Sequence, residues 1–147
     1  MSKGNIFSSD FLKLIFNTTA IADLAENDAS SPATTLTVAL HTTPGPGEAG
    51  TQATNEIAYT GYARIAVART AGGWSITGGD PDPATVSPAA NIDFGEMTGG
   101  AGGTVTHFSV GTGVANKLLY HGTVTPNIVV TTGVTPRLKT TTTITED

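Results

Sequence analysis

The sequence predicts an all-β protein: a single jelly-roll-like antiparallel β-sandwich of about eight strands, preceded by a short N-terminal helical segment. Threonine and glycine, 27 and 18 of the 147 residues, dominate the composition, while charged residues make up only 13%. Threonine favours strands and glycine favours turns. From residue 34 onward, short stretches of alternating apolar and polar residues are separated by glycine- and proline-rich turns. No helical crossover separates these stretches, which favours a sandwich over a parallel sheet.

The first 30 residues predict a helical arm, and residues 31–147 the sandwich domain. Ser8 or Ser9 can cap a helix. The apolar side chains that follow share one helical face: Phe11, Leu12, Ile15 and Phe16. Ile21 and Leu24 can extend the pattern beyond Thr18 and Thr19. Because a helix this short is marginal alone in water, its apolar face must pack on something, either this chain's own core or a neighbouring subunit.

The alternation of Leu36, Val38 and Leu40 with polar or small residues gives the clearest strand. Gly72–Gly73 suggests a tight hairpin between strands at 65–68 and 74–77, with Trp74 as a core or hairpin anchor. Two long loops are expected, at 42–55 and 78–90. The further expected strands cover residues 57–59, 92–94, 104–110, 117–124, 128–131 and 137–145.

Composition excludes several classes of function. Seven basic residues spread from Lys3 to Lys139, in a chain of net charge −5, provide no patch for nucleic acid. The absence of cysteine excludes disulfides and thiolate metal sites. No apolar run is long enough to span a membrane, and the N-terminus has no secretory signal pattern.

No catalytic, cofactor-binding or metal-binding residues are predicted, so we expect no cofactor and no enzyme activity. His41, His107 and His121 are expected at outward or strand-end positions, and their spacing matches no ligand motif. Ser109 lacks the first glycine of a nucleophile elbow, and nothing in the sequence places a base beside it. The segment 80–83 (DPDP) predicts a turn, with a weak calcium site as the less favoured alternative.

Surface contacts are the remaining source of function. Tyr59 and Tyr62 are aromatic residues with polar atoms, a type favoured at interfaces. The threonine-rich tail, with Thr141 and Thr143, predicts an edge strand that can also accept a strand from a partner. With the helix face, the candidate interface residues are Phe11, Leu12, Ile15, Phe16, Tyr59, Tyr62, Thr141 and Thr143.

Six segments resemble stretches in small virion proteins of tailed bacteriophages. They are 36–42 (LTVALHT), 47–50 (GEAG), 54–57 (TNEI), 59–64 (YTGYAR), 68–70 (ART) and 72–74 (GGW). Size and expected fold are most similar to capsid cement (decoration) proteins. That resemblance implies a structural protein made in the bacterial host cytoplasm and carried on the outer capsid surface of the virion.

Its implied partners are the major capsid protein and further copies of itself, as a homodimer or homotrimer; no nucleic acid or membrane partner is expected. The N-terminal segment and the two long loops are the expected contact regions. The alternative is a tail, baseplate or fibre-attachment protein. A carbohydrate-binding module or small hydrolase is disfavoured, because aromatic residues are sparse and no acid/base pair is evident.

Overall fold

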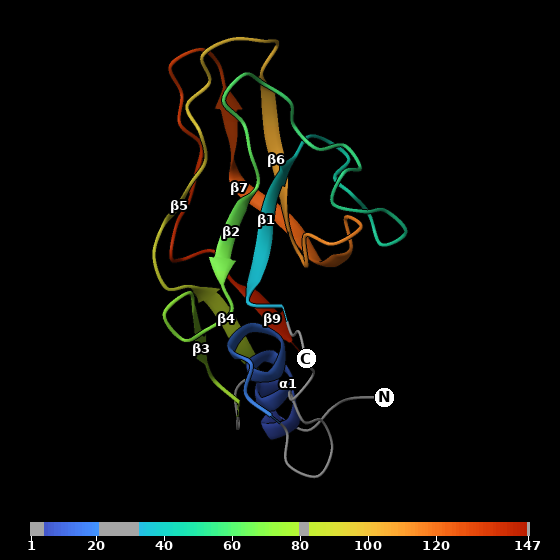
Figure 1. Cartoon of the computed structure of the whole chain (residues 1–147), viewed down its shortest axis with the longest axis vertical. Helices are drawn as coiled ribbons and strands as arrows, with labels where there is room; N and C mark the ends of the chain where they lie inside the picture. Colours follow the sequence, from blue (N-terminus) through green and yellow to red (C-terminus); the bar gives the residue numbers. More distant parts are fainter. Residues whose placement is uncertain (1–4, 21–32, 80–82, 147) are drawn as a thin grey trace. The chain divides into compact units, whose positions relative to one another are not determined.

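The computed structural model describes residues 5–20, 33–79 and 83–146, which contain one helix and nine strands (Figure 1). These are α1 (Asn5–Asn17), β1 (Thr35–His41), β2 (Ile65–Ala68), β3 (Trp74–Thr77), β4 (Ala84–Pro88), β5 (Ile92–Asp93), β6 (Gly103–Gly111), β7 (Leu118–Val130), β8 (Arg137–Leu138) and β9 (Ile144–Glu146). The strands form sheets of order β2-β1-β6-β7, β3-β4-β9 and β5-β8. Every pairing recorded between strands is antiparallel. The predicted class, all-β with a short N-terminal helix, is confirmed.

The chain divides into two compact units that alternate along the sequence. Residues 1–35, 67–91 and 139–147 form the first unit, and residues 36–66 and 92–138 form the second. The first therefore holds α1 and the β3-β4-β9 sheet. The second holds most of the four-stranded sheet and the β5-β8 pair.

In the first unit, α1 packs on all three strands of its sheet (Figure 1). Leu12 and Phe16 are completely buried, and the Phe16 ring meets the Trp74 ring edge-on with centroids 4.8 Å apart. The apolar helix face thus covers this chain's own sheet, the first of the two alternatives expected. Trp74 is a core residue, which is one of the two roles predicted for it.

The C-terminal end of α1 is held by residues outside the helix. Its last turn has no basic residue, yet the guanidinium of Arg69 donates to the carbonyls of Leu14 and Ile15. A cation at this position satisfies carbonyls that have no helical partner and opposes the helix dipole. Thr18 adopts φ 56°, and the Thr19 N–H bonds the Lys13 carbonyl at 3.1 Å, which closes the helix.

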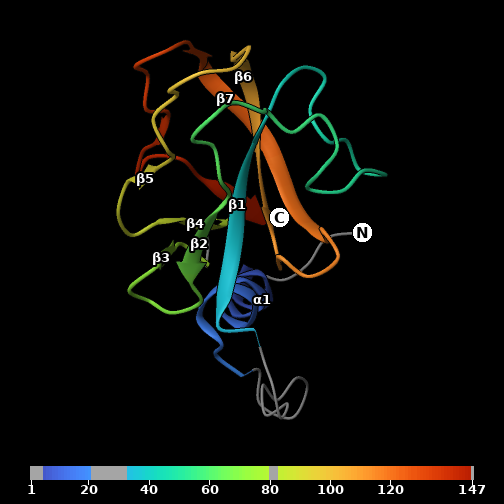
Figure 2. The same cartoon turned by 45° about the horizontal axis from the view of Figure 1, so that its top comes forward.

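In the second unit, β1 and β6 lie at the centre of the four-stranded sheet (Figure 2). Their register pairs Val38 with Val110 and Leu40 with Phe108, all buried, on one face. Because side chains alternate across a strand, the opposite face carries the residues between them. That second face is polar: Thr37, His41, His107 and Ser109.

Two predictions around β3 and β4 are wrong. β2 and β3 belong to different sheets, so Gly72–Gly73 turns the chain between sheets and forms no hairpin. The expected 78–90 loop contains β4, the central strand of the β3-β4-β9 sheet, whose burial alternates along its length. Pro88 is tolerated because it lies at the end of β4, beyond the three residues paired with β9.

The C-terminal half also differs from the predicted strand boundaries. The two strands expected at 117–124 and 128–131 form one strand, β7, with a register shift opposite β6. The strand expected at 137–145 is two short strands, β8 and β9, in different sheets. Residues 57–59 form no strand and lie between isolated bridges at Glu56 and Thr60.

Some predictions concern residues outside the described part of the chain. These are the extension of the helix through Ile21 and Leu24, the domain boundary at residue 30, and the turn or calcium site at Asp80 and Asp82. The helix that is described is too short to cross a membrane.

Candidate functional site

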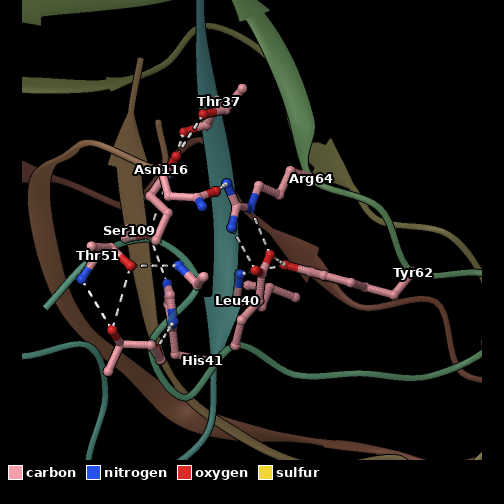
Figure 3. A network of polar contacts seen from close by, with 12 residues as sticks. Thr37, Leu40, His41, Thr51, Tyr62, Arg64, Ser109 and Asn116 are labelled. Atoms are coloured by element: carbon pink, nitrogen blue, oxygen red, sulfur yellow. Dashed lines mark hydrogen bonds and ion pairs between the residues drawn. The ribbon is translucent and has the colours of Figure 1, made fainter. Parts of the chain in front are cut away.

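The polar face of the β1–β6 pair is covered by residues 42–55, here called the anchored loop, and the contacts around it form the candidate site (Figure 3). The loop is closed at its base, where the Thr42 N–H donates to the Asn55 carbonyl at 2.9 Å. Asn55 Nδ2 also donates to the Gly45 carbonyl at 2.8 Å. Gly45, at φ 81°, passes so close to the His107 ring that a Cβ would lie 2.7 Å from it, so only glycine fits there.

The imidazole of His41 joins the loop to the sheet. Its Nδ1 lies 2.9 Å from the Thr54 carbonyl and its Nε2 lies 2.7 Å from Ser109 Oγ. A carbonyl only accepts, so Nδ1 carries the proton and donates it to Thr54. In the neutral ring Nε2 is then the acceptor, and the Ser109 hydroxyl donates to it.

Gln52 is the second connection between loop and sheet, and its side chain is completely buried. Its amide Nε2 donates to the Thr37 carbonyl at 2.9 Å, and its Oε1 accepts from the Thr37 hydroxyl at 2.7 Å. Nε2 also reaches Ser109 Oγ at 3.4 Å. The loop thus supplies further hydrogen-bond partners to polar groups on β1 and β6.

Glu56, Tyr62 and Arg64, which follow the anchored loop in the sequence, form a charged cluster with Asn116. Arg64 donates from Nε and Nη2 to the two carboxylate oxygens of Glu56, at 2.8 and 2.6 Å, in a bidentate pair. Its Nη1 donates to Asn116 Oδ1 at 2.7 Å, and the Tyr62 hydroxyl donates to Glu56 at 2.9 Å. The Tyr62 oxygen in turn accepts the Leu40 N–H at 3.0 Å, which ties the cluster to β1.

Burial shifts the pKa values of two groups in this network, His41 and Tyr62. Burial holds the pKa of His41 below its usual value, against the opposing effects of the Thr54 carbonyl and the Glu56 carboxylate. Burial likewise raises the pKa of Tyr62. His41 is therefore neutral at pH 7, as its bond from Ser109 requires.

The His41–Ser109 pair has the spacing of a base and a nucleophile, but not their environment. Both side chains are 0% exposed, and a backbone carbonyl takes the position that a carboxylate occupies in a catalytic triad. Two sequence predictions are corrected here: a base does lie beside Ser109, and His41 faces inward. His41 is buried because β1 is covered on both faces. His107 is half-buried and His121 exposed.

No group of three or more His, Asp or Glu side chains able to hold a metal ion occurs within residues 5–20, 33–79 and 83–146. A second bidentate ion pair, Arg137 with Asp93, joins β8 to β5 at an exposed position. The hydrogen bonds from Arg137 lower the pKa of Asp93.

The eight candidate interface residues do not form one patch within a single unit. In the first unit, Leu12 and Phe16 are buried and Phe11 and Ile15 half-buried on α1; Thr141 and Thr143 are exposed between β8 and β9. In the second unit, the buried Tyr59 donates to the Gly95 carbonyl at 2.8 Å, and Tyr62 belongs to the charged cluster. Whether these residues meet a partner stays a prediction.

Sequence reasoning missed Gln52, Glu56 and Arg64. A glutamine in a loop carries no periodic signal. Glu56 and Arg64 belong to the segments quoted above for their resemblance, but their spacing of eight residues does not predict an ion pair.

The model of a protein family described as podophage GP4 fiber I protein gp80 matches residues 14–145. No curated protein matches the chain.

Proposed function

Since the chain belongs to the podophage GP4 fiber I protein gp80 family and is a structural protein of a bacteriophage virion, we propose that it is a component of a podophage fibre. The observation that carries this proposal is the extent of the match, which includes nearly every described element of both units. Within that role, we propose the anchored loop as the contact surface. Two buried side chains, His41 and Gln52, fix its path, while Thr43, Glu48, Ala49, Thr51 and Ala53 remain exposed.

The capsid cement role is the alternative. It has less support than the fibre role, because the family description names a fibre protein. A cement protein and a fibre component can share a β-rich, cysteine-free chain, so composition does not distinguish them. Their positions and copy numbers do differ, because a cement protein repeats over the whole shell.

The test is to locate the protein in purified virions. Gold-labelled antibody should mark the tail end of the particle, and quantitative mass spectrometry should give a copy number close to those of other tail proteins. Label distributed over the head, with a copy number comparable to that of the major capsid protein, would assign the cement role and overturn the fibre proposal.

The proposal also holds that the protein performs no catalysis, with His41–Ser109 as a structural pair. Ser109 is fully buried in β6, between Ala39 on β1 and His121 on β7, and has no room for an approaching carbonyl group. A fluorophosphonate probe, which labels activated serines, should not react with the folded protein. Labelling of the wild type that disappears in Ser109→Ala would contradict this part of the proposal.

A further inference from the structure

All three histidines of the chain lie on the polar face of the four-stranded sheet, one on each of three neighbouring strands. His41 on β1 is directly opposite His107 on β6, and Ser109 on β6 is directly opposite His121 on β7. Residues directly opposite each other in an antiparallel pair have their side chains on the same face. The anchored loop covers this face over β1 and β6, whereas His121 on β7 is exposed. The loop therefore lies over titratable groups.

Each end of the anchored loop rests on one of the two covered histidines. Near its end, the Thr54 carbonyl accepts from His41 Nδ1 at 2.9 Å. Near its beginning, Gly45 lies so close to the His107 ring that a Cβ would be 2.7 Å from two ring carbons. Between them, the backbone N–H of Gln52 donates to a backbone carbonyl of the turn between β6 and β7, at 3.0 Å. Movement of the loop away from the sheet would break these contacts together.

The closed loop holds His41 in its neutral form. The ring is completely buried, so a second proton at Nε2 would place a cation beneath the loop. Among the groups around the ring, Glu56 favours its protonation, and Arg64 and His107 oppose it. Glu48 is the only charged side chain of residues 42–55 and is exposed, so the loop brings no carboxylate of its own to the ring. A charged ring at this position is therefore better solvated by water than by the closed loop.

Opening of the loop would expose His41 to water, where the ordinary pKa of a histidine is about 6.5. Because burial lowers the pKa of His41 in the closed form, the open form binds the proton more tightly. Proton binding therefore favours the open form as the pH falls below 6.5. For one proton, the equilibrium constant for opening rises by up to about tenfold per pH unit, until the lower pKa of the closed form is reached.

We propose that the anchored loop is an acid-released cover: protonation of His41 at Nε2 opens residues 42–55 as a unit while the four-stranded sheet stays folded. Opening exposes Thr37, His107 and Ser109 together with His41, so that the polar face becomes continuous across β1, β6 and β7. This inference goes beyond the proposed fibre role and does not depend on it, because it concerns one sheet and the loop that covers it.

Native-state hydrogen exchange of the full chain, with each rate corrected for the intrinsic effect of pH, tests the proposal. The backbone N–H of Gln52 reports on the loop, and the backbone N–H groups of β6 report on the sheet. In the wild type, Gln52 should be less protected than β6, and its protection should not change in low urea, as local opening requires. That protection should also fall by up to about tenfold between about pH 7.5 and about pH 5.5.

His41→Gln and His121→Gln are matched variants, because the two histidines lie on the same face but only His41 is buried. The pH dependence of Gln52 protection should disappear in His41→Gln and remain in His121→Gln. Three results would overturn the proposal: a wild type without this pH dependence, a dependence that survives in His41→Gln, or exchange of Gln52 only together with β6.

A second pair of variants opens the loop without changing a titratable group. Gly45→Ala and Gly47→Ala each place a side chain at a positive φ, 81° and 66°, but only the Cβ at residue 45 meets the His107 ring; at residue 47 it meets nothing within 4 Å. At about pH 7.5, Gly45→Ala should lower the protection of Gln52 by about tenfold relative to Gly47→Ala and leave β6 protected. Equal effects of the two substitutions, or an equal loss of protection in β6, would show that the loop does not open separately from the sheet and would overturn the proposal.

Discussion

The buried ring of His41 illustrates how one protonation state can hold two segments together. With Nδ1 donating to Thr54, only the neutral ring can accept from Ser109. A second proton would turn Nε2 into a donor, so the Ser109 hydroxyl would have to rotate and accept instead, and a charged ring would lie in a site that water does not reach. Three charged or titratable groups affect the ring: Glu56 favours its protonation, and Arg64 and His107 oppose it.

This arrangement predicts a pH-dependent stability. Because burial lowers the pKa of His41 below that of the unfolded chain, the unfolded state takes up a proton first as the pH falls. The free energy of unfolding should therefore fall between pH 6.5 and the lower pKa of the folded state, by less than ~1.4 kcal/mol per pH unit for one proton.

Urea unfolding at several pH values measures this dependence. His41→Gln should lower the stability at pH 7 and flatten the dependence below pH 6.5, whereas His121→Gln, at an exposed position, should retain it. An unchanged slope in His41→Gln would contradict the assignment.

The backbone conformation of Thr18 also affects stability. Its φ of 56° lies in the left-handed region, which a β-branched residue adopts at a cost of about 1–2 kcal/mol and glycine adopts freely. Thr18→Gly should therefore raise the free energy of unfolding by up to about 1 kcal/mol. Thr19→Gly, one residue later, serves as the control and should give no such gain; a loss of stability in Thr18→Gly would show that the hydroxyl's bond to the Asn17 carbonyl matters more.

Sequence reasoning failed for His41 for a physical reason. Alternation in residues 36–41 assigns one buried and one exposed face, yet β1 is buried on both faces from Val38 onward. The second covering comes from the anchored loop, through contacts of residues as far apart as Gln52 and Ser109. The local pattern of a strand does not indicate that a segment distant in the sequence covers its second face.

At the scale of elements, the anchored loop depends on Gln52. Gln52→Ala removes two hydrogen bonds to Thr37 and the 3.4 Å contact with Ser109, while the Thr37 hydroxyl keeps its bond to the Gly111 carbonyl and Ser109 keeps its bond with His41. The lost hydrogen bonds should cost about 1–3 kcal/mol in total. Because the loss is local, residues 42–55 should become more open to proteases while the rest of the sheet stays folded.

Limited proteolysis with mass spectrometry, together with amide hydrogen exchange, measures this change. The control is Glu48→Ala, an exposed position in the same loop, which should leave both the cleavage rate and the exchange unchanged. If Gln52→Ala protected the loop as well as the wild type does, the loop would be held by its other bonds.

Several strands were predictable, although β4 was missed and the strand expected at 57–59 does not form; strand partners were not predictable. Glycine and proline punctuation marked the ends of β1, β3 and β6 to within a residue or two, because these residues act locally. Partners depend on which apolar faces must be covered. Trp74 is buried against Phe16 and pairs with Pro88, and that packing places β3 with β4 rather than with β2.

For the whole molecule, the order of the segments couples the two units. The three segments of the first unit are joined by residues 36–66 and 92–138, which belong to the second. If the second unit unfolded alone, the first would have to hold its segments together across two long flexible loops, at an entropic cost. We therefore expect both units to unfold in one cooperative transition.

The single tryptophan, Trp74, makes this testable, because its fluorescence reports on the first unit alone. Val110→Ala removes buried methyl groups from the core of the second unit and should cost about 1–3 kcal/mol. In urea, the midpoint of Trp74 fluorescence should fall together with that of far-UV circular dichroism. Val114→Ala, at a 72% exposed position, should move neither. If Val110→Ala shifted the circular dichroism midpoint and left the Trp74 midpoint in place, the units would be independent, and the order of their segments would not govern stability.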